Sequence, residues 1–84
     1  NQFEDPDFYI ENELIALAAK AIRELPEDYR RAFEMNRFDN LTYNEIAERT
    51  GVSPKTVAYR ISQALKILRV ELKDYMPLLM VLLS

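Results

Sequence analysis

Residues 41–68 constrain the fold of this chain more than any other part of its sequence. Thr42, with Glu45 three residues later, has the pattern of a capping box at the start of a short helix. Gly51 tolerates the positive φ of a sharp turn, and Ser53-Pro54 has the residue types that begin a second helix. A short helix, a glycine turn and a longer second helix are the signature of a helix-turn-helix motif.

The second motif helix is predicted to have one apolar and one polar face. Apolar residues recur at steps of three and four, at Val57, Ile61, Ala64, Leu65 and Leu68. At about 100° per residue, the opposite face carries Lys55, Tyr59, Ser62, Gln63 and Lys66. These polar side chains can bond to base edges or reach phosphates, and the second helix of the motif enters the major groove. The pattern therefore favours DNA recognition, although a polar face on an isolated helix is usually only solvated.

Ala47 and Val57 are predicted to lie buried where the two motif helices cross. The small Ala47 allows the close approach of the two helices, and Val57 fills the angle between them. At the turn, Gly51 is expected to adopt a left-handed conformation.

Composition narrows the class of protein. Eighty-four residues, of which 49% are hydrophobic, allow one domain with a modest core. Without cysteine or histidine there is no disulfide, thiolate site or imidazole catalyst, and neither a metal site nor a cofactor is expected. No signal peptide is apparent, and we expect a cytoplasmic protein. Because the chain begins at Asn1 rather than methionine, we expect a fragment of a longer protein.

The net charge of −3 conceals two halves of opposite sign. Up to Glu48 there are 5 basic and 12 acidic residues, whereas from Arg49 onward there are 6 basic and 2 acidic residues. The positive charge thus lies in the predicted DNA-binding helix. Because this excess is modest, isolated DNA binding should be weak and strongly dependent on salt.

The remaining segments predict an all-α fold, a small right-angled four-helix bundle that contains the helix-turn-helix. Residues 1–7 are interpreted as the end of a linker, and residues 8–75 as the domain. A first helix over residues 8–24 has an apolar stripe at Ile10, Leu14, Leu17, Ala18, Ala21, Ile22 and Leu25. Pro26 opens a second helix that runs to Arg37, with Tyr29, Ala32 and Phe33 facing inward. The last helix is expected to continue to about Tyr75.

Two further features concern partners and catalysis. Ile67 and Val70 lie off the core stripe, and either a protein contact or packing within the chain fits them. Residues 76–84 form an apolar tail, too short to span a membrane, which we expect to fold back or to be buried by a partner, including a second copy of the chain. Carboxylate pairs such as Glu45 and Glu48 fit solvated helix faces, so no catalytic residue and no enzyme activity are predicted.

Three motifs together resemble region 4 of the sigma-70 family of initiation factors, in its extracytoplasmic-function subgroup. They are Leu25-Pro26-Glu27, Tyr43-Asn44-Glu45-Ile46-Ala47 and Ser53-Pro54-Lys55-Thr56-Val57, within a match that covers residues 22–72. The resemblance implies a bundle of the sigma region 4 type, similar to winged-helix folds, that recognises the promoter −35 element. It also implies double-stranded promoter DNA, the β flap of core RNA polymerase and an anti-sigma factor as partners.

Site residues follow from the same resemblance by position. The slots that read bases are occupied by Ala58, Tyr59, Ser62 and Gln63. The slots that hold the DNA backbone are occupied by Lys55, Thr56, Arg60 and Lys66. Many relatives carry arginine or lysine where this chain has Ala58 and Gln63, which implies fewer contacts to guanine.

Two alternative functions stay open at this point. A LuxR-type response-regulator output domain is also a four-helix helix-turn-helix protein, but the Leu-Pro-Glu opening and the long last helix count against it. A helix-turn-helix fold used only to bind protein would suit the acidic first half and the apolar tail. Symmetry of the DNA footprint tests the first alternative, and DNA binding at low salt tests the second.

Overall fold

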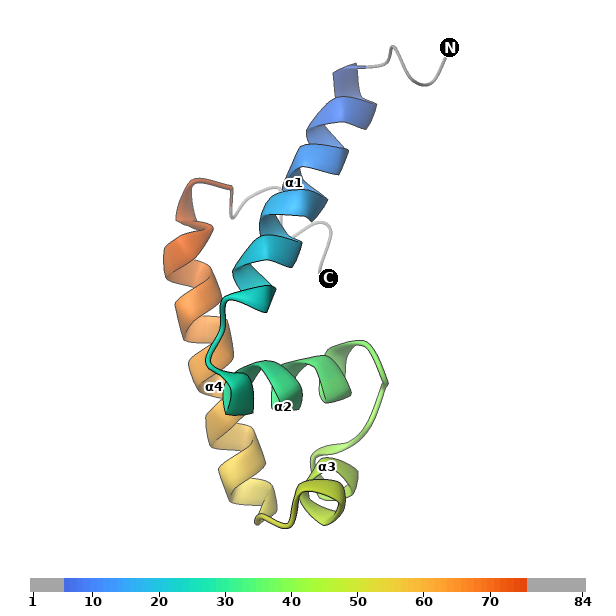
Figure 1. Ribbon diagram of the computed structural model, residues 1–84, viewed down its shortest axis with the longest axis vertical. Coiled ribbons are helices and arrows are strands. Elements are labelled where there is room, and N and C mark those ends of the chain that lie inside the picture. The colour runs from blue at the N-terminus through green and yellow to red at the C-terminus, as the bar shows by residue number, and fades with distance from the viewer. Residues whose placement is uncertain (1–5, 76–84) are drawn as a thin grey trace. The chain divides into compact units, whose positions relative to one another are not determined.

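The computed structural model describes the backbone of residues 6–75 and the side chains of residues 12–75. Regular structure in this part of the chain is helical throughout (Figure 1): α1 (Pro6–Arg23), α2 (Glu27–Arg37), α3 (Tyr43–Thr50), α4 (Pro54–Glu71) and the short 3-10 helix η2 (Lys73–Tyr75). The predicted all-α fold with a helix-turn-helix is confirmed. The apolar tail, for which burial was predicted, lies outside the described residues.

The chain divides into two compact units. The helix-turn-helix unit is residues 25–67 and contains α2, α3 and most of α4. The terminal unit is residues 1–24 and 68–84, and it contains α1 and the last turn of α4. The helix-turn-helix unit therefore contains α3, all but the last turn of α4 and all predicted DNA contacts.

Within the terminal unit, α1 buries only part of its predicted apolar stripe. Leu14 and Ala21 are buried, and Ala18 is half-buried. Leu17 also belongs to this stripe, but its side chain is 37% exposed. Leu14, Ala18 and Ala21 fix the centre of the buried face, and at about 100° per residue Leu17 lies at its edge. The side chain of Ile10 is not among those described.

The core of the helix-turn-helix unit joins its three helices. Ala32 from α2, Ile46 and Ala47 from α3, and Val57 and Ile61 from α4 form one buried cluster. Ile46 and Val57 are completely buried, and Ala47 is 5% exposed, as predicted for the helix crossing. Partly buried side chains complete this cluster at Met35, Leu41, Val52 and Leu65.

The predicted inward face of α2 is confirmed for two of its three residues. Ala32 and Phe33 are each 3% exposed, whereas Tyr29 is only half-buried. Phe33 packs edge-to-face against Phe38, with ring centroids 6.1 Å apart. This pair leaves Phe38 56% exposed at the end of the helix.

The connection between α2 and α3 turns at a residue that the sequence pattern did not single out. Asn40 has a φ of 57°, a conformation that asparagine tolerates better than most residues. The Asn36 side-chain amide donates to the Leu41 carbonyl at 2.9 Å, and the Leu41 N–H donates to the Met35 carbonyl at 3.1 Å. These bonds satisfy backbone groups in the connection and direct the chain into α3.

Both ends of α3 have the predicted local structure. The Glu45 N–H donates to Thr42 Oγ1 at 3.1 Å, and the Thr42 N–H donates to Glu45 Oε1 at 2.9 Å, which completes the capping box. Gly51 ends the helix with φ 72° and ψ 26°, and its N–H donates to the Ala47 carbonyl at 2.9 Å. The left-handed glycine cap is confirmed.

The last helix is shorter than predicted. α4 ends at Glu71, and η2 follows it, with the Tyr75 N–H donating to the Leu72 carbonyl at 2.9 Å. A bond three residues back marks the change to a 3-10 turn. Among residues 6–75, no helix combines the length and apolar content needed to cross a membrane.

Candidate nucleic-acid interface

A serine cap fixes the start of α4. Ser53 Oγ accepts a hydrogen bond from the Thr56 N–H at 3.1 Å, and the Ser53 carbonyl accepts the first helical bond from the Val57 N–H at 3.1 Å. Pro54 occupies the first helical position, where a missing N–H costs nothing. The predicted helix start is confirmed, and it sets which side chains of α4 face the core and which face outward.

The four predicted base-contacting residues differ in exposure. Tyr59 is 57% exposed and Ser62 is exposed, whereas Ala58 and Gln63 are half-buried on the two flanks of the outward face. The core residues Val57 and Ile61 lie next to these positions in the sequence but face inward, and they are at most 4% exposed. This face can offer bases a phenol, a hydroxyl and a carboxamide, and Ala58 adds a methyl group for apolar contact.

Tyr59 is supported from the neighbouring helix by Tyr29 of α2. The two rings pack edge-to-face at 82°, with centroids 6.4 Å apart. The pKa of Tyr29 is raised, mainly by side-chain hydrogen bonding with Tyr59 and then by the charge of Tyr59. Because a packed aromatic partner restricts ring rotation, Tyr59 is held outward before any ligand arrives.

The four predicted phosphate-contacting residues fall into two groups. Lys55 and Lys66 are exposed on the outward face of α4. Thr56 and Arg60 are half-buried on its flank, and the Thr56 hydroxyl lies 3.0 Å from Ser53 Oγ. Of these four side chains, only the two lysines are exposed on the outward face. A flexible cation needs this exposure to reach a phosphate.

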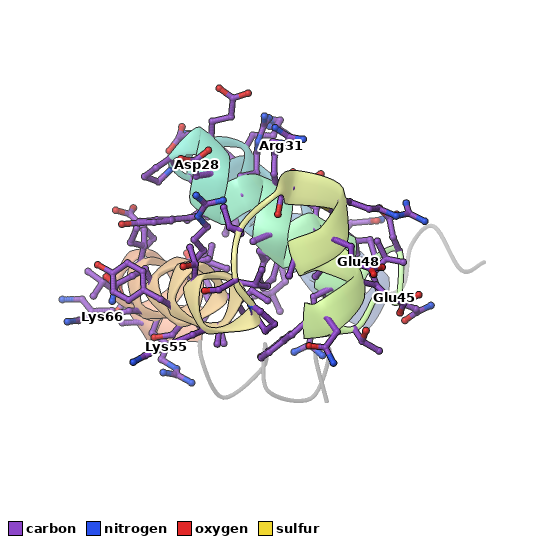
Figure 2. All side chains as sticks on the ribbon, turned by 90° about the horizontal axis from the view of Figure 1, so that it is seen from below. Asp28, Arg31, Glu45, Glu48, Lys55 and Lys66 are labelled. Carbon is purple, nitrogen blue, oxygen red and sulfur yellow. The ribbon has the colours of Figure 1, made fainter. Side chains whose placement is uncertain are left out.

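Charge is separated by side within the helix-turn-helix unit. Residues 25–67 contain seven basic and six acidic residues, although the whole chain has a net charge of −3. In Figure 2, Lys55 and Lys66 extend from one side of α4, and Glu45 and Glu48 extend from α3 on the far side of the unit. The positive side is the one that carries the outward face of α4, which suits a polyanion.

Two basic residues beside Arg60 were missed by the sequence analysis. A hollow between the three helices is lined by Arg31 of α2 and Arg49 of α3 as well as by Arg60, together with Asp28. These residues are far apart in the sequence and follow no motif of their own. Only the packing of the three helices brings them together.

In the described part of the chain, no three His, Cys, Asp or Glu side chains gather in a way that could hold a metal ion. Glu48 is exposed, and the exposed Glu45 is engaged in the capping box.

Comparison with known proteins agrees with this geometry. The family model "Sigma-70, region 4" matches residues 15–68. Over 53 residues the chain is 40% identical to the RNA polymerase sigma factor SigV of Bacillus subtilis (strain 168), an alignment that covers 63% of this chain and 32% of that protein. The chain thus spans about a third of the length of this relative. No solved structure matches this chain significantly. With the serine cap and most of α4 inside the matched segment, the chain belongs to the sigma-70 region 4 family.

Proposed function

We propose that this chain is the DNA-binding domain of an alternative RNA polymerase sigma factor and that it recognises the promoter −35 element. The observation that carries the proposal is the outward face of α4, an exposed polar and basic surface on the second helix of a helix-turn-helix. A helix of this kind enters the major groove with its N-terminal residues against the base edges. Membership of the sigma-70 region 4 family makes promoter DNA the expected ligand.

Each predicted contact has a role that follows from its chemistry. Tyr59, Ser62 and Gln63 read base edges, and Ala58 leaves room for a thymine methyl group. The phosphates are held by Lys55, Thr56, Arg60 and Lys66. With few arginine or lysine side chains on the reading face, the recognised sequence should depend less on guanine than that of a helix with arginine at these positions.

The remaining partners are part of the same proposal. The modest positive charge suits a module that is tethered to its DNA by core RNA polymerase, through the β flap, because tethering raises the effective concentration. An anti-sigma factor is the expected regulator, and the apolar tail over residues 76–84 is a candidate contact for it or for a second copy of the chain. We place the domain at residues 8–75 of a cytoplasmic protein that needs no cofactor and performs no reaction of its own.

Selection of DNA from a random pool tests the proposal. The intact protein, bound to core RNA polymerase, should enrich one asymmetric sequence located upstream of the start site. Failure to enrich any sequence would refute DNA reading and favour a role in protein binding alone. Enrichment of a palindrome by a dimer would instead favour a response-regulator output domain.

A further inference from the structure

A hollow of about 260 Å³ lies between α2, α3 and α4 in the helix-turn-helix unit. Its floor is apolar, because the lining residues Ala32, Ile46 and Val57 are each at most 3% exposed. Thr50 also lines it, and the Thr50 hydroxyl donates to the Ile46 carbonyl at 2.7 Å. The hydroxyl proton is therefore already used, so a ligand in the hollow must find its donors in the charged side chains of the rim.

The rim of this hollow carries an excess of positive charge. Arg31, Arg49 and Arg60 come from three different helices, and Asp28 is the one carboxylate among the lining residues. Figure 2 shows that Asp28 and Arg31 both extend from α2. With three arginines and one aspartate among the lining residues, the hollow has a net charge of about +2.

The three arginines are not engaged in the ion pairs found among the described side chains. Those pairs are Lys20 with Glu24, and Arg30 Nε with Glu34 Oε1 at 3.6 Å. Arg30 thus has a carboxylate partner on its own helix, whereas the adjacent Arg31 lines the hollow instead. Three arginine side chains that line one hollow with an apolar floor are suited to an anion.

The position of the hollow selects the kind of anion. It is lined by both helices of the motif, and in a helix-turn-helix complex the first of these helices crosses the DNA backbone while the second enters the groove. The planar fork of arginine matches phosphate oxygens with two hydrogen bonds. Resting on the DNA-binding function proposed above, we infer that this arginine hollow seats a phosphate of the DNA backbone, with Arg31 and Arg49 acting together with Arg60. Asp28 moderates the charge and weakens the binding.

Charge-neutralising variants of the intact protein, bound to core RNA polymerase, test this inference on the preferred duplex. Arg31→Gln and Arg49→Gln should each weaken binding roughly tenfold, equally for all sequences. Because the hollow holds one phosphate, the two substitutions together should flatten the dependence of log affinity on log salt by about 0.9. Asp28→Asn should have the opposite effect and tighten binding. Thermal unfolding of each variant establishes that it is folded.

Arg37→Gln is the matched control, because Arg37 is an exposed arginine of α2 that does not line the hollow. It removes the same charge, so a purely general electrostatic effect would make it equal to Arg31→Gln. Equal losses for the two variants would overturn the inference. An unchanged affinity of the Arg31→Gln and Arg49→Gln variants for DNA would also overturn the inference. If the wild type still preferred one sequence in that case, the proposed function would remain intact.

Neutralising single phosphates of the duplex locates the contact. Replacing one phosphate at a time by a methylphosphonate should weaken binding of the wild type at one or two adjacent positions. At those positions the Arg31→Gln/Arg49→Gln variant should lose no further affinity, because its contact is already gone. If no position shows this coupling, and inorganic phosphate alone raises the melting temperature of the wild type but not of the variant, the hollow binds a free anion and the assignment to DNA is wrong.

Discussion

Glu45 illustrates at the residue scale how a cap changes the titration of the group that makes it. The pKa of Glu45 is lowered below 4.5, mainly by the hydrogen bond from the Thr42 N–H. The Thr42 side chain and the charge of Arg49 lower it further. A carboxyl whose pKa is lower in the folded state stabilises the fold above its unfolded pKa. That contribution is lost as the pH falls from 4.5 through the folded pKa.

Replacing this carboxylate tests the link between the cap and pH. Glu45→Gln keeps an oxygen acceptor for the Thr42 N–H but removes the charge. We expect the variant to have a lower free energy of unfolding than the wild type at neutral pH, and the difference to shrink below pH 4.5. Denaturant unfolding at a series of pH values measures it. A difference that stays constant through this range would contradict the role of the ionised carboxylate.

At the scale of elements, the helix-turn-helix depends on a turn and on a crossing. At the turn, Gly51 has a φ of 72°, and a Cβ added there would meet no heavy atom within 4 Å. Any penalty for a side chain at this position is therefore due to backbone conformation rather than to a steric clash. At the crossing, Ala47 is buried beside the fully buried Ile46 and Val57.

Two substitutions at the turn separate these causes. Gly51→Ala should destabilise the domain by about 1–2 kcal/mol, the cost of a left-handed conformation for a residue with a Cβ. Gly51→Asn should cost less, because asparagine tolerates this conformation. Chemical denaturation measures both variants. Equal losses for alanine and asparagine would show that the backbone conformation is not the cause.

A larger side chain at the crossing should be costly for a different reason. Ala47→Leu overpacks the contact between α3 and its neighbours, and we expect a loss of about 1–3 kcal/mol in the free energy of unfolding. Ala16→Leu is the control, since Ala16 is an exposed alanine within a helix. Similar melting temperatures for the two variants would contradict a close helix crossing at Ala47.

The sequence predicted those features whose causes lie within a few residues. The capping box of Thr42 and Glu45, the left-handed Gly51 and the start of α4 each depend on local hydrogen bonds or on backbone conformation. Sequence spacing predicted less about features that depend on packing between helices, such as side-chain burial and the meeting of distant residues. The apolar stripe includes Leu17, although this side chain lies at the edge of the buried face. The spacing also did not show that Arg31 and Arg49 line the same hollow as Arg60.

At the scale of the whole molecule, function depends on how charge is distributed rather than on its sum. The net charge of −3 would repel DNA, yet the residues from Arg49 onward contain six basic and two acidic side chains. Electrostatic attraction of this local kind falls steeply with salt. Binding by the isolated chain should accordingly be weak at physiological ionic strength, and the polymerase should supply the remaining affinity by tethering.

The apolar tail should contribute to the stability or the association of the whole molecule. Full burial of three leucines contributes on the order of 5 kcal/mol, which is comparable with the total stability of a small domain. Deleting the residues after Tyr75 should lower the melting temperature, or dissociate a dimer if the tail packs in a second copy. Calorimetry and light scattering measure the two effects. Unchanged melting and unchanged mass would mean that the tail buries nothing.

The most direct measurement of the central claim compares a base contact with a phosphate contact on α4. Gln63→Ala and Lys66→Gln are assayed in the intact protein with core RNA polymerase, on the preferred duplex and on each single-base substitution of it. Gln63→Ala should lose about 1–3 kcal/mol of discrimination at one base position, whereas Lys66→Gln should weaken all duplexes alike and reduce the salt slope by about one. If Gln63→Ala leaves both the affinity and the preferred sequence unchanged, this face of α4 does not read DNA as proposed.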